Sequence, residues 1–197
     1  SEIAEAGGIR SFVIWLEDPN QGPPEVAARA LSEIALDNPD TQAQVAEEGA
    51  IWPLIEIVRG WQRAKDAVAG LPGNLSSRAT SVIAALKLAI VAVGTLATLA
   101  KDNVVNQIMI AEEGGISPLL QLLQDKTGSA HENATKALWH LAHQEDNQLA
   151  IPACGGVAPL VKLLTTGNEM TQQYSAAAIR ALTKDNLENQ IALTSAG

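Results

Sequence analysis

Aromatic residues and cysteine are scarce in this chain. Aromatics make up 3% of its 197 residues, so aliphatic side chains and alanine must form the interior. Small aliphatic residues let helices approach closely, which favours an all-α fold. The single cysteine, Cys154, excludes an intramolecular disulfide and a cysteine-based zinc cluster. We interpret Cys154 as a packing residue at a turn, with a reactive thiol as the alternative.

Basic charge is also in short supply. Thirteen Lys and Arg residues face 22 Asp and Glu residues, which gives a net charge of −9. A field of this sign repels nucleic acid and anionic lipid, so nucleic acid is not expected as a partner. The chain has no Gly-rich phosphate loop, no G-x-S-x-G and no H-E-x-x-H. We therefore predict a protein that is not an enzyme and has no cofactor, metal or small-molecule substrate.

The first residues, SEIAEAGG, match neither a signal peptide nor a transit peptide. Together with the single cysteine, they favour a reducing compartment. We expect a cytoplasmic location, with the nucleus or an organelle as alternatives. The chain does not begin with Met, and we interpret it as a mature chain or a piece of a longer protein.

A stretch of fourteen residues, IAEEGGISPLLQLL, recurs with variations along the chain. Its four copies and a truncated fifth begin at Ile3, Val45, Ile110, Ile151 and Leu193. These anchors lie 42, 65, 41 and 42 residues apart, so the second repeat carries an insertion, at about residues 60–81. A period of this size indicates stacked helical repeats, because one repeat cannot bury its own apolar faces. We predict a single repeat domain over residues 1–197.

Each copy has the same internal order. A short first helix begins at a polar pair and ends at glycine, which permits the left-handed backbone that stops a helix. The polar pairs are Thr41-Gln42, Asn106-Gln107, Asn147-Gln148 and Asn189-Gln190. A second helix follows with proline in its first turn, at Pro53, Pro118 and Pro159. The third helix is longer and has an apolar stripe at i, i+3, i+4 and i+7.

The short helix, the glycine kink, the pattern I-x-P-L-[LIV]-x-[LI]-[LIV] and the long Ala/Leu-rich helix resemble the armadillo repeat family. The resemblance covers nearly the whole chain outside residues 61–80. It implies a right-handed α-α superhelix of about four repeats, whose third helices line a concave groove that binds extended protein segments. We expect the insertion to lengthen two helices of the second repeat into a projecting helical hairpin.

The resemblance also indicates which residues face the groove. Armadillo proteins such as importin-α hold Trp and Asn at two positions of the third helix. Here those positions hold Arg29 and Glu33, Gly94 and Thr98, Lys136 and His140, and Ala177 and Ala181. None is Trp or Asn, so the chain does not match a typical importin-α peptide groove. With further residues at helical spacing, the predicted partner-binding set is Arg29, Glu33, Thr98, Lys101, Lys136, Trp139, His140, His143, Arg180 and Lys184.

Five of the 13 basic residues fall on this face, beside one carboxylate. We therefore predict a scaffold whose basic groove binds an extended acidic or phosphorylated partner segment, and we expect charge reversal at Lys136 and Arg180 to abolish binding. A merely solvated helix face is the alternative. Trp139 is expected to be a binding hot spot, or a core residue if the register is off by one. His140 and His143 have no evident third ligand for a metal.

The insertion suggests a second surface, with the contact residues Trp61, Arg63, Lys65 and Arg78. After it, residues 82–100 approach the length of a membrane span. We expect no span, because the repeat register requires their second half as a third helix. The alternative function is a structural subunit packed into a larger assembly, including one at a membrane, through the hairpin and lateral faces. A repeat domain attached to an enzyme in a longer chain is a third hypothesis.

The last repeat also leaves an apolar face, formed by Ile179, Leu182, Ile191 and Leu193. An uncapped solenoid end exposes the surface that its neighbour would have covered. We expect further repeats or another chain, including a second copy, to cover this face.

Overall fold

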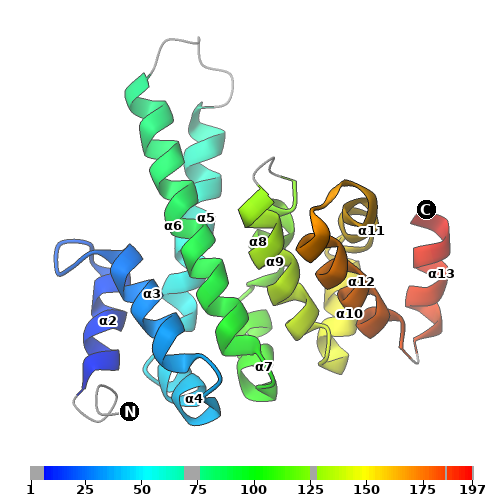
Figure 1. Ribbon diagram of the computed structural model, residues 1–197, viewed down its shortest axis with the longest axis horizontal. Coiled ribbons are helices and arrows are strands. Elements are labelled where there is room, and N and C mark those ends of the chain that lie inside the picture. The colour runs from blue at the N-terminus through cyan, green and yellow to red at the C-terminus, as the bar shows by residue number, and fades with distance from the viewer. Residues whose placement is uncertain (1–6, 69–75, 125–127, 185, 197) are drawn as a thin grey trace.

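The computed structural model describes residues 7–68, 76–124, 128–184 and 186–196. All regular secondary structure within these ranges is helical. The helices are α2 (Gly8–Glu17), α3 (Pro24–Ala35), α4 (Pro39–Glu47), α5 (Ile51–Val68), α6 (Ser76–Ala100), α7 (Val104–Glu112), α8 (Ile116–Leu122), α9 (Gly128–Leu141), α10 (Glu145–Ala153), α11 (Val157–Thr166), α12 (Glu169–Thr183) and α13 (Leu187–Ala196). They follow one another along a single long axis (Figure 1), which confirms the predicted all-α solenoid.

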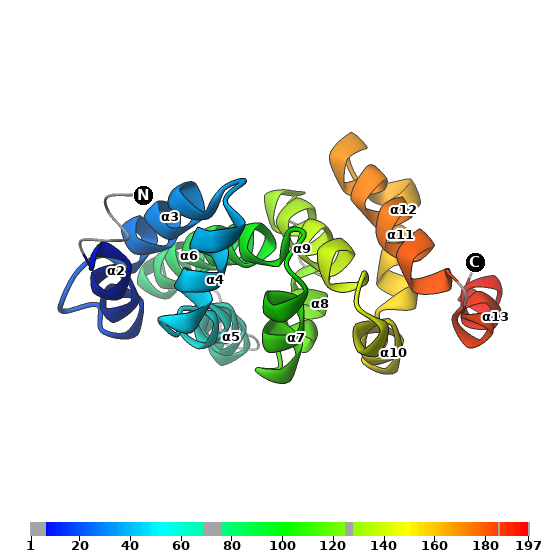
Figure 2. The ribbon, with the colours of Figure 1, turned by 90° about the horizontal axis from the view of Figure 1, so that it is seen from below.

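The repeats stack through their third helices. α4, α5 and α6 form one repeat, α7, α8 and α9 the next, and α10, α11 and α12 the one after. The third helices α3, α6, α9 and α12 contact one another in turn. In Figure 2 they form one row, and the short helices α4, α7 and α10 lie along the opposite side. We call this row the third-helix face.

Glycine forms the turn that precedes the second helix of each repeat. The turn glycines have positive φ angles: 76° at Gly7, 86° at Gly49, 74° at Gly114 and 78° at Gly155. Only glycine adopts this left-handed backbone without strain. A hydrogen bond from the next amide to the end of the first helix closes the turn, as from Gly156 to the carbonyl oxygen of Ile151 at 2.9 Å. The predicted glycine kink is confirmed, and each predicted proline is the third residue of its helix.

The first helices begin two residues before the polar pairs, so the predicted starting points are wrong. A side chain upstream caps each helix. Asn38 accepts a hydrogen bond from the amide of Thr41 at 3.1 Å, and Asn103 accepts one from the amide of Asn106 at 3.0 Å. Capping asparagine satisfies an amide that the first turn leaves without a partner. The polar pairs are therefore free for another role.

That role is to join consecutive repeats. The side-chain amide of Asn106 donates hydrogen bonds to the carbonyl oxygens of Leu99 at 2.9 Å and Gln42 at 3.1 Å. Gln107 donates to the carbonyl oxygen of Ala100 at 2.9 Å. Asn147 and Asn189 make the equivalent bonds in the following repeats. These asparagines are buried, so their bonds hold the first helix of each repeat against the preceding repeat.

The second repeat contains the two longest helices, α5 with 18 residues and α6 with 25. They pack against each other and extend beyond the other helices (Figure 1). Residues 69–75, within the predicted insertion, lie outside the described residues. One segment of α6, Thr80–Ala100, is long and apolar enough to cross a membrane, with a mean hydropathy of 2.2. Its window is 44% buried, and α6 contacts α3, α5 and α9, as a core helix of a solenoid does.

Together, α10 and α11 would also be long and apolar enough to cross a membrane if they formed one span, but they meet at an angle of 84°.

At the end of the array, α13 packs against α11 and α12. Leu182 is 3% exposed as a result, so the expectation that it lies uncovered is wrong. The side chains of Ile179 and Leu193 are half-buried. The first anchor, Ile3, lies outside the described residues.

Candidate functional site

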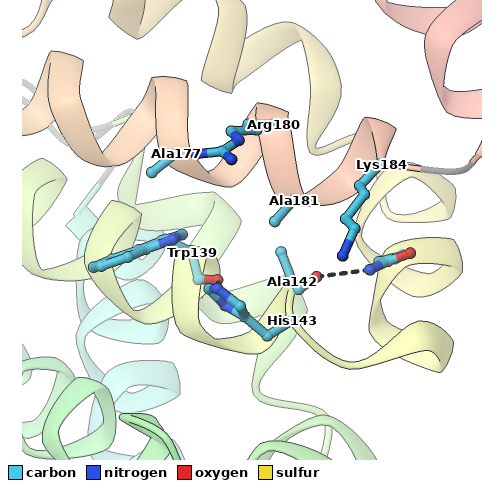
Figure 3. Close-up of a pocket in the computed structure, with 8 residues that line it drawn as sticks. Trp139, Ala142, His143, Ala177, Arg180, Ala181 and Lys184 are labelled. Carbon is cyan, nitrogen blue, oxygen red and sulfur yellow. Dashed lines mark hydrogen bonds between the residues drawn. The ribbon is translucent and has the colours of Figure 1, made fainter.

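The largest gathering of predicted binding residues lies between α9 and α12. Trp139 and His143 face Arg180 and Lys184 across a cavity of about 400 Å³ (Figure 3). Ala142, Gln148, Ala177 and Ala181 complete its lining. Four predicted residues from two repeats are thus brought together, and we call this cavity the α9–α12 pocket.

An aromatic cluster holds Trp139 in place. Its ring stacks on His140 at a centroid distance of 4.5 Å and on Tyr174 of α12 at 5.6 Å. His143 lies 5.8 Å away at a tilt of 60°. Contacts on several sides fix the rotamer of Trp139, so the part that remains exposed is a rigid surface. Tyr174 was not predicted, although its spacing of three from Ala177 puts it on the same side of α12.

Alanines account for the open space. Ala177 and Ala181 lie one turn apart on α12, opposite Trp139, and both are half-buried. Ala142 is fully buried beneath them. Methyl side chains cannot fill the gap between two helices that a tryptophan holds apart. The pocket therefore exists because small residues occupy the positions where the armadillo resemblance expects large ones.

The pocket is also basic. Arg180 in the last turn of α12 and Lys184, the residue that caps this helix, are both exposed and both line the pocket. Among the described residues, no carboxylate forms an ion pair with either of them. Nδ1 of the nearby His143 ring lies 2.9 Å from the carbonyl oxygen of Trp139, within hydrogen-bond distance. A carbonyl oxygen only accepts, so Nδ1 carries the hydrogen.

The other half of the third-helix face is neutralised. Lys101 forms an ion pair with Asp37, and this hydrogen bond raises the pKa of Lys101 and lowers the pKa of Asp37. Lys136 lowers the pKa of Asp37 further by its charge. Arg29 pairs with Glu25 at 3.0 Å. The prediction of a basic groove along the whole third-helix face is therefore wrong. Carboxylates that the sequence analysis did not place there neutralise Arg29 and Lys101.

Two predicted binding residues are buried. Thr98 is 6% exposed and shares a hydrogen bond of 3.1 Å with Ser32, which joins α6 to α3. His140 is 4% exposed, and burial, with a contribution from the charge of Lys136, lowers its pKa to about 4. The expectation that these side chains contact a partner is wrong, because their side of the helix packs into the interior. Glu33, like Arg29, is exposed.

The contact residues predicted for the insertion also include a buried side chain and a paired cation. Trp61 is 1% exposed and belongs to the core, with the Lys65 ammonium group 5.0 Å above its ring, so it is not a surface contact. Arg63 is exposed and pairs with Glu56 at 3.2 Å. The side chain of Arg78 lies outside the described residues. Cys154 is exposed, which contradicts its interpretation as a packing residue.

The part of the chain that the structure describes contains no candidate metal site. Within it, no three His, Cys, Asp or Glu side chains come together as a metal site would require. The α9–α12 pocket supplies cations and an aromatic surface, and its lining contains no carboxylate. This set suits recognition of an anionic or apolar group.

Comparisons with known proteins agree with the repeat pattern. A family model described as Armadillo/beta-catenin-like repeat matches residues 103–143 and 144–184. Human junction plakoglobin is 29% identical over 179 residues, which cover 90% of this chain and 24% of plakoglobin. The chain thus spans about a quarter of the length of this relative. Trp139 lies in the first matched repeat and Arg180 in the second, so the α9–α12 pocket lies between them.

Two solved structures are similar along almost the whole chain. Computationally designed armadillo repeat proteins for modular peptide recognition superpose with a TM-score of 0.74 at 25% identity, over 96% of this chain and 70% of the other. A designed armadillo repeat protein in complex with the peptide (KR)4 superposes with a TM-score of 0.77 at 24% identity, over 100% of this chain and 73% of the other.

Proposed function

Because this chain is an armadillo repeat protein, we propose that it is a non-catalytic protein–protein interaction scaffold. Its third-helix face binds an extended acidic or phosphorylated segment of a partner protein, in the cytoplasm. The observation that carries the proposal is the α9–α12 pocket, in which Arg180 and Lys184 lie beside Trp139. Peptide recognition by designed proteins of this fold supports a peptide as the ligand.

The sign of the charges supports an acidic ligand. The peptide (KR)4 on the designed relative is basic, whereas this chain presents cations on its third-helix face. Complementary charge directs association and rejects ligands of the same sign. The overall charge of −9 disfavours non-specific binding of acidic proteins, so recognition depends on this local patch.

Charge reversal in the pocket tests the proposal. The variant Arg180→Glu with Lys184→Glu should lose the partner proteins that the wild-type chain captures from a native extract. Both side chains are exposed, so the helical circular dichroism signal and the melting temperature should stay unchanged. The matched control, Arg10→Glu with Lys162→Glu, reverses two exposed cations on second helices and should retain the partners. Equal capture by both double variants would refute an acidic ligand in the pocket.

A second candidate function is a structural subunit that packs through the α5–α6 hairpin. Less than half of the apolar window of α6 is buried, and Ile83 is 55% exposed on it. Exposed apolar surface of this kind favours a permanent contact. The variant Ile83→Lys should then release the chain from a complex of fixed stoichiometry on size-exclusion chromatography. Under the scaffold proposal, the same variant leaves partner capture unchanged.

A further inference from the structure

We infer that the side of the array formed by the first helices binds a basic amphipathic helix of a partner protein. α7 and α10 lie on the opposite side of the molecule from the third helices (Figure 2), so the inference does not depend on the α9–α12 pocket. It gives the chain a second ligand, of opposite charge to the first. We call this surface the first-helix edge and define it by the exposed apolar residues of α7, α10 and α13: Val104, Val105, Leu149, Leu187 and Ile191.

The apolar side chains of the first-helix edge are among the most exposed in the described part of the chain. Val105 on α7 is 64% exposed, and Leu149 on α10 is 57% exposed. Single exposed apolar residues are normal on a protein surface, and they need no ligand to explain them. Several on neighbouring helices are different, because together they form a patch that another molecule can cover.

Hydrogen bonds between consecutive first helices place these side chains level with one another. The side-chain amide of Asn147 on α10 donates to the carbonyl oxygen of Gln107 on α7 at 3.2 Å. Asn189 on α13 donates to that of Gln148 on α10 at 2.8 Å. Counted from the repeat anchors, each donor lies one position before its acceptor, so equivalent residues of the three helices lie side by side. The residues two positions before each anchor therefore form one apolar row: Ile108, Leu149 and Ile191.

The charges on the first helices are all negative. α4, α7, α10 and α13 contain no lysine, arginine or histidine. Their carboxylates are exposed, and among the described residues none of them forms an ion pair. An apolar row among unpaired carboxylates attracts a cationic partner and repels anionic lipid, nucleic acid and the same edge of a second copy. The carboxylates are Asp40, Glu47, Glu112, Glu145, Asp146 and Glu188.

These carboxylates lie on both sides of the apolar row. On α10, Asp146 comes three residues before Leu149, which is about one helical turn. On α7, Glu112 comes four residues after Ile108, about one turn in the other direction. A ligand that fills the row therefore needs basic side chains along both of its edges. A helix with an apolar stripe between two basic borders has this arrangement.

The spacing of the first helices also favours a helical ligand. Packed helices stand about 8–10 Å apart, and an α-helix advances about 10 Å in seven residues. A ligand helix that crosses the edge thus brings apolar residues seven apart onto successive first helices. Its diameter of roughly 10 Å places the borders of its stripe over carboxylates on both sides. An extended strand, about 5 Å wide, is too narrow to reach both.

Selection from a phage-displayed library tests the inference on the full chain. The library presents an alanine-rich helix of about 18 residues, about 27 Å long, with one face randomised. Phage that also bind the double variant Val105→Gln with Leu149→Gln are removed in each round, so the retained peptides contact the first-helix edge. We expect large apolar residues seven positions apart, bordered by Lys or Arg. No enrichment, or enrichment of acidic peptides, would overturn the inference.

Fluorescence anisotropy then measures a selected peptide against single surface changes. Affinity should fall about tenfold or more for Leu149→Gln, which removes the centre of the apolar row. It should fall about threefold or more for Glu145→Gln with Asp146→Asn, and added salt should weaken binding to the wild-type chain. If Leu149→Gln lowers the melting temperature, Val105→Gln provides a more exposed substitution with the same expected direction.

Matched controls lie outside the first helices. Leu164→Gln removes an exposed apolar side chain from α11, and Glu17→Gln with Glu169→Gln removes two exposed carboxylates. Arg180→Gln with Lys184→Gln removes the cations of the α9–α12 pocket. All three should change affinity by less than about twofold. A loss in the pocket variant equal to that of Leu149→Gln would show that the peptide binds elsewhere and would overturn the inference.

Two further measurements test other occupants of the edge. Sedimentation velocity detects a second copy of the chain, and co-sedimentation with vesicles that contain phosphatidylserine detects a membrane. We expect neither interaction to depend on Leu149. Self-association or vesicle binding that Leu149→Gln abolishes would overturn the basic helix as the ligand, and so would a peptide affinity that both Leu149→Gln and Val105→Gln leave unchanged.

Discussion

The side-chain amide of Asn147 on α10 donates a hydrogen bond to the backbone carbonyl oxygen of Gln107 on α7, at 3.2 Å. The same nitrogen lies 3.0 Å from the carbonyl oxygen of Leu141, at the end of α9. One side chain therefore connects the first helix of its repeat to both the first and the third helix of the preceding repeat. Asn106 and Asn189 repeat this connection, which explains why an Asn-Gln pair recurs with the period.

Replacing Asn147 with alanine should lower the free energy of unfolding by about 2–4 kcal/mol. The substitution removes two buried hydrogen bonds and leaves two carbonyl oxygens without this donor. Urea unfolding monitored by circular dichroism measures the change. The control Gln173→Ala, at an exposed position of α12, should stay within about 0.5 kcal/mol of wild type. Equal stability of the two variants would show that the connection between repeats contributes nothing.

Two glycine substitutions should have opposite effects. Gly155→Ala should destabilise the chain by about 1–2 kcal/mol, because its φ of 78° strains any residue with a β-carbon, although nothing lies within 4 Å of the added atom. Gly60→Ala, inside α5, should stabilise it by about 0.5–1 kcal/mol. The nearest atom to the new β-carbon there is the flexible end of Arg63, at 3.9 Å. Thermal unfolding of both variants measures these changes, and a shift in the same direction would contradict the backbone argument.

His140 should make stability depend on pH between about 6.5 and 4. Its pKa in the folded chain is about 4, below the ordinary 6.5, so the unfolded chain binds more protons in this window. Stability is therefore complete above pH 6.5 and is lost as the pH falls toward 4. Between pH 7 and pH 5 the loss should be about 2 kcal/mol. Urea unfolding of His140→Gln at the same two pH values should show a correspondingly smaller loss, and an unchanged pH dependence would exclude His140 as its source.

Removing Asp37 should strengthen binding of acidic peptides at low salt. Asp37 has a φ of 53° and neutralises Lys101, so Asp37→Gly keeps the backbone conformation and frees the cation on the third-helix face. We expect affinity to rise about two- to fivefold by fluorescence anisotropy. Asp40→Asn removes one negative charge from an exposed position of α4 and serves as the control. An equal gain in both variants would indicate an effect of overall charge alone.

The repeat architecture could be predicted from the sequence. Glycine turns, prolines in the first turn and apolar stripes act through the local backbone and through contacts with the adjacent repeat, so they can be read wherever the pattern recurs. Trp139, His143, Arg180 and Lys184 were also placed correctly together, because helical spacing from a regular anchor puts them on the same face. The starts of the first helices were missed, because the capping residues Asn38, Asn103 and Gln144 lie three residues before the polar pairs that were taken as the starts.

The exposure of the predicted side chains and the pairing of their charges depend on contacts between distant parts of the chain. One residue along a helix turns a side chain by about 100°, so the adjacent residues Trp139 and His140 become a pocket wall and a buried ring. Asp37 and Lys101 are 64 residues apart, and no local pattern predicts their contact. The pocket itself depends on how far α9 and α12 stand apart, and the packing of Trp139 against Tyr174 sets that distance.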